Sequence, residues 1–214
     1  MIRLGISVEG QTEQEFVRKV LAPHLWNFGI DPRASIVNTR IDADGTRYKG
    51  GSVSVERAAR NIRPLLGSFD WTTTFYDLYG FDDRRTDESA DELEARLSDR
   101  LNNRRFIAYV QQYEFEALLF ASPDAAERVF ASTALRDALS GVSEGFATPE
   151  HINDSRETSP SHRLEAIFAI HLRRGYDKVV DGRLLLESAG LPAVRTRCPR
   201  FNTWLARLES LADT

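Results

Sequence analysis

The first 121 residues show two alternating patterns of apolar positions. Short runs of β-branched and aromatic residues, typical of buried strands, occur at about 2–8, 35–38, 71–80 and 106–111. Between these runs, apolar residues recur at helical spacing over about 12–28, 53–66 and 87–101, and a further helix is predicted to start at Glu114. Strands that alternate with helices predict an α/β fold with a mostly parallel sheet and helices on its faces.

The first predicted helix carries residues that favour its start, its interruption and its end. Thr12 and Glu15 fit a capping box, in which each side chain satisfies a free backbone amide. Pro23 is expected to kink or divide the helix, and Gly29 suits a left-handed cap at its end. A second capping box is predicted at 89–92.

The pattern changes after residue 122. Helical segments dominate from there, at roughly 123–140, 162–173, 183–189 and 200–212. The predicted organisation is an α/β core over residues 1–121 and a helical C-terminal extension over residues 122–214, packed together as one compact unit.

Composition narrows the class of protein. The chain has 214 residues and a formal net charge of −4, which argues against coating nucleic acid by bulk charge. Lys19, Lys49 and Lys178 are its only lysines. Arginine grips phosphate bidentately, although codon usage in a GC-rich genome explains the same bias. The single cysteine, Cys198, excludes a disulfide framework.

No apolar run approaches the roughly 18–20 residues that span a bilayer. The apolar start at 2–8 is too short for a signal peptide. We therefore expect a cytoplasmic protein without a membrane partner.

Carboxylates lie near the carboxyl ends of three of the predicted strands. Glu9 comes directly after the first, Asp77 lies in the third, and Glu114 and Glu116 follow the fourth. The carboxyl ends of parallel strands share one edge of a sheet, so these acids are expected to converge there. Clustered carboxylates repel one another unless a cation lies among them, and oxygen ligands alone suit Mg²⁺ or Mn²⁺.

Within this predicted site, Glu9 is a candidate general base or acid, and Gly10 allows a sharp turn after it. Glu13 is a supporting candidate, but an acid in the first turn of a helix is also favoured by the helix dipole. The same alternative applies to Glu114 and Glu116. Asp77 is harder to explain structurally, because a lone acid in an apolar, aromatic strand is costly.

These residues resemble a known arrangement. The segment Val8-Glu9-Gly10-x-Thr12-Glu13, then Asp77, then Glu114-Phe115-Glu116-Ala117-Leu118-Leu119 is similar to the Toprim site of overcoming-lysogenization-defect (OLD-type) nucleases. Over nearly its full length the chain resembles a bacterial family catalogued as domain of unknown function 4276. The stretches that carry this second resemblance are 8–16, 75–81, 110–122 and 195–205.

The Toprim resemblance implies a role for each acid. Glu9 corresponds to the catalytic glutamate, Asp77 to the first aspartate of the Asp-x-Asp motif, and Glu114 and Glu116 to the later acidic pair. The second Asp-x-Asp position is Tyr79, which cannot usefully ligate magnesium. The neighbouring acids at 82–83 are candidates to compensate for it.

A basic and aromatic cluster lies near the C-terminus. Arg195, Arg197 and Arg200 precede or flank Phe201 and Trp204, a mixture that holds phosphates and stacks bases. The alternative is a helix start whose apolar residues pack into the core while the arginines are solvated.

Two functions from different classes fit these observations. The first is a metal-dependent nuclease that cleaves phosphodiester bonds in DNA or RNA, within a bacterial anti-phage defence system. The second is a non-catalytic adaptor or toxin subunit on a Toprim scaffold, for which the resemblance implies a partner ATPase. A phosphotransfer or primase-like enzyme shares the same acids and stays open.

Overall fold

The computed structural model of the chain describes residues 1–41, 47–49, 52–153 and 156–213, and it divides into two compact units. Unit 1 comprises residues 1–111 and 207–214, and unit 2 comprises residues 112–206. The division falls after residue 111, where the sequence placed it after residue 121, and the C-terminal residues belong to unit 1.

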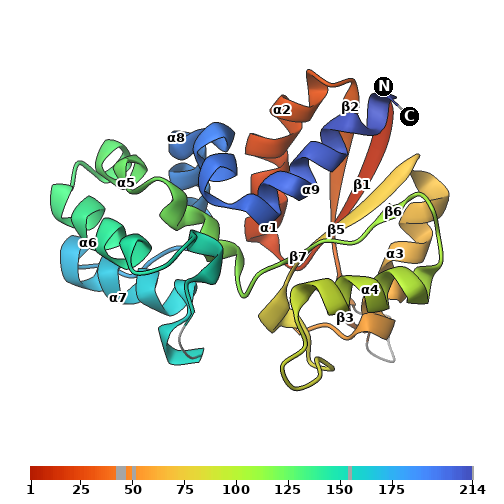
Figure 1. Cartoon of the computed structure of the whole chain (residues 1–214), viewed down its shortest axis with the longest axis horizontal. Helices are drawn as coiled ribbons and strands as arrows, with labels where there is room; N and C mark the ends of the chain where they lie inside the picture. Colours follow the sequence, from red (N-terminus) through yellow and green to blue (C-terminus); the bar gives the residue numbers. More distant parts are fainter. Residues whose placement is uncertain (42–46, 50–51, 154–155, 214) are drawn as a thin grey trace. The chain divides into compact units, whose positions relative to one another are not determined.

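Unit 1 is built on a parallel sheet with strand order β2-β1-β5-β6, and β7 also pairs with β5 (Figure 1). The strands are β1 (Ile2–Val8), β2 (Ile30–Ile36), β5 (Trp71–Asp77), β6 (Phe106–Ile107) and β7 (Val110–Gln111). All their pairings are parallel. Five consecutive residues of β1, from Leu4 to Val8, are buried, as expected for a strand covered on both faces. The predicted α/β fold with a mostly parallel, helix-flanked sheet is confirmed.

Helices connect these strands. Between β1 and β2 lie α1 (Gln11–Phe16), a π-helical turn η1 (Val17–Leu21) and α2 (Ala22–Trp26). Further along the chain, α3 (Val55–Ser68) leads into β5, and the 3₁₀ turn η2 (Leu78–Gly80) and α4 (Ala90–Leu101) lead out of it. Parallel connections are right-handed, so the helices from 11–26 cover one face of the sheet and α3 covers the other.

The ends of the first helix differ in part from the prediction. Its N-cap is Gly10, and Glu13 closes the capping box, so the box predicted at Thr12 is wrong. Pro23 occupies an N-terminal position of α2, where its missing N–H costs little. The helix is interrupted as predicted, by the π-helical turn η1 that comes before Pro23. Gly29 has the predicted left-handed conformation, with φ 71°.

Two strand predictions are also corrected. The second strand begins at Ile30, directly after Gly29, and is longer than predicted. The run at 106–111 is broken into β6 and β7. At the break, Thr74 Oγ donates to the carbonyl oxygen of Tyr109 at 2.7 Å and accepts from its N–H at 2.9 Å, which replaces strand pairing there. An additional antiparallel pair, β3 (Asn38–Ile41) and β4 (Arg47–Lys49), follows β2.

Unit 2 is helical in the residues described. Its α-helices are α5 (Pro123–Phe130), α6 (Thr133–Glu144), α7 (Pro160–Leu172), α8 (Val180–Arg197) and the first part of α9 (Pro199–Glu209). Short 3₁₀ segments are η3 (Phe115–Ala121), η4 (Pro149–His151) and η5 (Arg156–Thr158), and η6 (Ser210–Asp213) closes unit 1. The helix predicted at 123–140 divides at Ala131, which has φ 51°. Every residue of η3 is buried, so η3 lies in the core.

Among the residues that the structure describes, no helix is long and apolar enough to cross a membrane.

Candidate functional site

The strand order of unit 1 reverses between β1 and β5. From β1 the chain moves outward to β2 and then returns across β1 to form β5 on its other side. In open parallel sheets, ligands bind outside the carboxyl ends of the two strands at such a reversal. Val8 pairs with Phe75, so Glu9 and Asp77 follow at nearly the same level of neighbouring strands. The structure therefore brings these two predicted site residues together.

The Glu9 carboxylate is held in place by the end of β5. Its Oε1 accepts a hydrogen bond from the backbone N–H of Asp77, with N and O 2.8 Å apart. It also lies against Gly80, where an added β-carbon would come within 2.5 Å of the Glu9 carboxyl carbon. A strand end and a glycine thus fix the position of the carboxylate. Gly80 was not recognised from the sequence, although a glycine three residues after a strand-end acid was visible there.

A buried polar pair lies next to Glu9. Ser7 and Tyr76 join their hydroxyl oxygens at 2.5 Å between β1 and β5. Burial raises the pKa of Tyr76 above its ordinary value, and the negative charge of Glu9 acts in the same direction. The Tyr76 hydroxyl therefore stays protonated and serves as a neutral hydrogen-bonding group beside the site.

The supporting residues have local structural roles. Glu13 Oε2 accepts from the N–H of Gly10 at 2.8 Å and completes the capping box of α1. Glu13 is only 8% exposed, so its contact orders the turn directly after Glu9. Gly10 and Glu13 thus shape the segment that carries the candidate catalytic acid.

The acids at 82–83 serve the start of α3. Asp83 accepts from the N–H of Val55 at 3.2 Å and from Arg96 Nη2 at 3.0 Å. Asp82 forms an ion pair with Arg57 at 3.5 Å. Both carboxylates therefore have structural partners, and a role that compensates for Tyr79 stays a prediction.

Glu114 and Glu116 belong to unit 2. Glu114 Oε2 accepts from the N–H of Ser161 at 2.9 Å, at the start of α7. Glu116 is 4% exposed, and its Oε1 lies 3.4 Å from Lys178 Nζ. Burial raises the pKa of Glu116, while the Lys178 ammonium lowers it and the Glu114 charge raises it further. In unit 2 the predicted acidic pair thus caps a helix and binds a lysine, and its predicted convergence with Glu9 and Asp77 stays a prediction.

A family model described as Domain of unknown function (DUF4276) matches residues 8–209. The chain belongs to this family. The match confirms the resemblance to DUF4276, and the resemblance to Toprim nucleases stays a prediction. The comparison with curated proteins and the comparison with solved structures each found no significant match.

The three arginines predicted to bind nucleic acid surround the start of α9 in the DUF4276 chain. Arg195 Nε donates to Asn202 Oδ1 at 2.6 Å, and Arg197 Nη2 donates to Ser143 Oγ at 3.1 Å. The backbone N–H of Arg200 donates to Glu150 at 2.9 Å. Phe201 and Trp204 are buried, 0% and 4% exposed, and so cannot stack on bases. The aromatic half of the predicted cluster is part of the core.

Within the described parts of the DUF4276 chain, no group of three or more Asp, Glu, His or Cys side chains is arranged to hold a metal ion. Mg²⁺ commonly takes only one or two carboxylates and completes its shell with waters and substrate phosphates, so binding of this ion by Glu9 and Asp77 stays a prediction. Of the four predicted ligands, Glu9 and Asp77 lie in unit 1, and Glu114 and Glu116 lie in unit 2.

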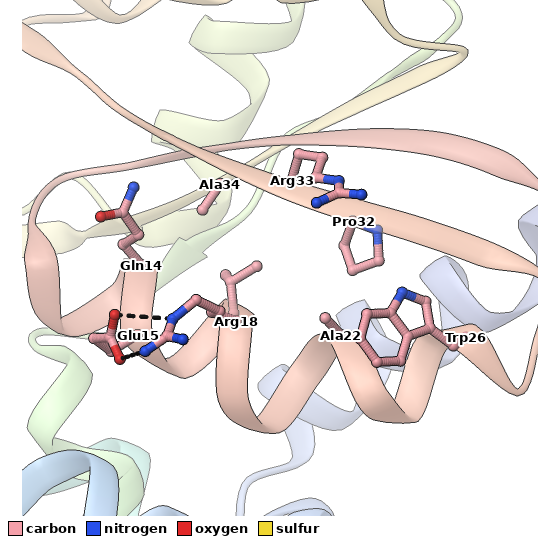
Figure 2. Close-up of a pocket in the computed structure, with 9 residues that line it drawn as sticks. Gln14, Glu15, Arg18, Ala22, Trp26, Pro32, Arg33 and Ala34 are labelled. Carbon is pink, nitrogen blue, oxygen red and sulfur yellow. Dashed lines mark hydrogen bonds and ion pairs between the residues drawn. The ribbon is translucent and has the colours of Figure 1, made fainter.

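A surface groove of about 490 Å³ lies elsewhere in unit 1 (Figure 2). It runs between the helical segment 11–26 and the edge strand β2, and its lining includes Trp26 and Pro32 at one end and the ion pair of Glu15 and Arg18 at the other. None of the candidate acids lines it. The predicted chemistry is therefore not at this groove.

Proposed function

We propose that this DUF4276 protein is a metal-dependent nuclease that hydrolyses phosphodiester bonds at the carboxyl ends of β1 and β5. The observation that carries the proposal is the fixed position of Glu9 at the strand-order reversal. Its carboxylate is held by the Asp77 N–H at 2.8 Å and lies against Gly80. A charged group held this firmly at a strand edge costs desolvation and freedom, which favours a chemical role for it.

The donor set fits a hard divalent cation. Glu9 and Asp77 would be its protein ligands, and Mg²⁺ or Mn²⁺ bound there would polarise a phosphoryl oxygen and stabilise its developing charge. Glu9 would accept the proton of the water that attacks phosphorus, and the leaving oxygen would take a proton from solvent. The Asp77 N–H orients the Glu9 carboxylate for this transfer.

The test is cleavage of plasmid DNA and of tRNA by purified protein in Mg²⁺ or Mn²⁺. Glu9→Gln is expected to lower the rate by at least about 100-fold, since a general base contributes roughly 10²–10⁴-fold. Asp77→Asn weakens a proposed metal ligand and should also lower the rate. Calorimetry with Mn²⁺ is expected to show a binding site that Glu9→Gln removes.

The matched control is Asp70→Asn. Asp70 lies at the amino end of β5, away from the carboxyl ends that carry Glu9 and Asp77. It forms an ion pair with Arg3 at 2.8 Å on the surface. This variant should cleave like the wild type. Cleavage that persists unchanged in Glu9→Gln would reveal a contaminating nuclease and refute the proposal.

Tyr79 favours a second candidate, a non-catalytic adaptor or toxin subunit that acts through a partner ATPase. In the resemblance to Toprim enzymes it takes the place of the second aspartate, and the acids at 82–83 are paired with structural partners. This candidate would be supported if the folded wild-type protein neither cleaves nucleic acid nor binds Mn²⁺. Mn²⁺ binding that is lost in Glu9→Gln would count against it.

A further inference from the structure

A cation lies over the aromatic ring that replaces the second acid. The guanidinium carbon of Arg84 is 5.4 Å from the centre of the Tyr79 ring, within the range of a cation–π contact. Tyr79 follows Asp77 by two residues and immediately precedes Gly80, which touches the Glu9 carboxylate. Tyr79 thus lies in the turn η2 beside the candidate catalytic residues, and Arg84 lies in the loop that follows η2.

Arg84 follows two acids that are paired with other arginines. Asp82 is paired with Arg57, and Asp83 with Arg96. Within the part of the chain that the structure describes, Arg84 forms no ion pair with a carboxylate. None of the carboxylates in that part of the chain is paired with the guanidinium. The contact with the Tyr79 ring holds the guanidinium without using its N–H donors. Arginine held in this way presents several N–H donors to a phosphate.

We propose that Tyr79 and Arg84 bind the phosphodiester backbone of the nucleic-acid strand that is cleaved at Glu9 and Asp77. This inference rests on the proposed function and adds the residues that hold the substrate. Where the resemblance would place a second metal-binding aspartate, this chain carries Tyr79, and its ring holds the guanidinium of Arg84. Arg84 contacts a phosphate near the scissile one, and Tyr79 keeps the guanidinium in place.

The experiment measures binding of fluorescently labelled single-stranded DNA and RNA oligonucleotides to full-length protein carrying Glu9→Gln, in Mg²⁺, by anisotropy over a range of salt concentrations. Adding Arg84→Ala is expected to weaken binding roughly tenfold, the effect of one charged hydrogen-bonding contact. The slope of log affinity against log salt should fall by about 0.7, which corresponds to one phosphate on a single strand. The DNA and RNA arms show which backbone is preferred.

Two further variants separate the ring from the charge. Tyr79→Phe keeps the platform and should bind like the parent, while Tyr79→Ala should approach Arg84→Ala. The matched control is Arg104→Ala. Arg104 is exposed and lies just before the amino end of β6, away from the carboxyl ends of the strands. This variant should leave both affinity and salt slope nearly unchanged. Circular dichroism melts confirm that each variant is folded.

The outcomes are distinct. Failure of the parent protein to bind either oligonucleotide would overturn the inference, as would equal losses in Arg84→Ala and Arg104→Ala. If the wild type cleaves nothing while binding depends on Arg84 and not on Arg104, the proposed catalysis fails and the phosphate-binding role of this pair stands. If cleavage depends on Glu9 but Arg84→Ala leaves affinity and salt slope unchanged, the catalysis stands and this inference fails.

Discussion

The Glu9 carboxylate occupies space that any side chain at position 80 would need. A β-carbon there would come within 2.5 Å of the Glu9 carboxyl carbon. The Glu9 carboxylate is the end of a flexible side chain, so it can move aside while the backbone of η2 stays in place. At the scale of single residues, Gly80 thus sets the position of the acid more than it sets the stability of the fold.

Gly80→Ala should therefore separate activity from stability. We expect cleavage and Mn²⁺ binding to fall towards the level of Glu9→Gln, with a loss of at most about 1–3 kcal/mol in the free energy of unfolding, the usual cost of overpacking. Calorimetry with Mn²⁺ and urea unfolding measure the two effects. The control is Gly67→Ala in α3, where a β-carbon meets open space and the helix gains up to about 1 kcal/mol. Unchanged Mn²⁺ binding in Gly80→Ala would contradict this role.

At the scale of elements, η3 shows what the acidic pair of unit 2 does. Its seven residues are buried, and Glu114 at its N-cap position accepts from the Ser161 N–H that begins α7. Glu116, inside η3, is accompanied by Lys178. One carboxylate satisfies a free helix amide, and the other has a lysine as counter-charge. Together they connect η3 to segments distant in sequence.

The raised pKa of Glu116 predicts how unit 2 responds to pH. A carboxyl group whose pKa is higher in the folded than in the unfolded protein binds its proton more tightly when folded. Stability should therefore fall as the pH rises above about 4.5, the ordinary pKa of a glutamate, and level off above the folded-state pKa. Glu116→Gln cannot titrate, so it should lack this fall and gain over the wild type by about 1.4 kcal/mol for each unit of elevation.

Urea unfolding at a series of pH values measures this difference. Lys178→Met is the second variant to measure, because removing the ammonium should raise the pKa of Glu116 further and extend the fall in stability to higher pH. Parallel pH curves for the wild type and Glu116→Gln would contradict the assignment.

Local patterns predicted the features that depend on neighbours in sequence. The bounds of β1, the left-handed Gly29 and the capping box at 89–92 all agree with the structure. The contacts that define the candidate site link residues far apart in sequence, such as Glu9 with Gly80, and short-range periodicity cannot reveal these. Lys178 likewise gave no local indication of its role beside Glu116, although it is one of three lysines.

The start of β2 shows why an edge strand is hard to predict. Ile2 N–H donates to the Gly29 carbonyl oxygen, and Val37 N–H donates to the Val8 carbonyl oxygen. The odd-numbered residues of β2 therefore direct their backbone groups toward β1, and Pro32 directs its own away from it. A proline fits there because no N–H is needed on the outer side of the edge. Pro32 weakens the strand pattern in sequence and protects the exposed edge in the fold.

At the scale of the whole molecule, the chain leaves unit 1 after residue 111 and returns to it at residue 207. The returning segment is anchored in unit 1 by His24, whose Nε2 lies 2.5 Å from Glu209 Oε1. Leu208 and Leu211 in this segment are 0% and 3% exposed. Unit 1 thus contains every strand of the parallel sheet within its first 111 residues, yet it is completed by the C-terminus.

A truncation after Ala206 should consequently destabilise the protein although it removes no strand. Loss of two buried leucines, at roughly 1.5–3 kcal/mol each, predicts a decrease of about 3–6 kcal/mol in the free energy of unfolding, a large fraction of the 5–15 kcal/mol typical of a domain. Hydrogen exchange should show faster opening of β1 and β2, because the missing segment contacts the helix α2 that packs on β2. A truncation after Leu211 retains both leucines and Glu209, so it should match the full chain. Equal exchange rates in the two truncated proteins would mean that the parallel sheet holds unit 1 together without its C-terminal segment.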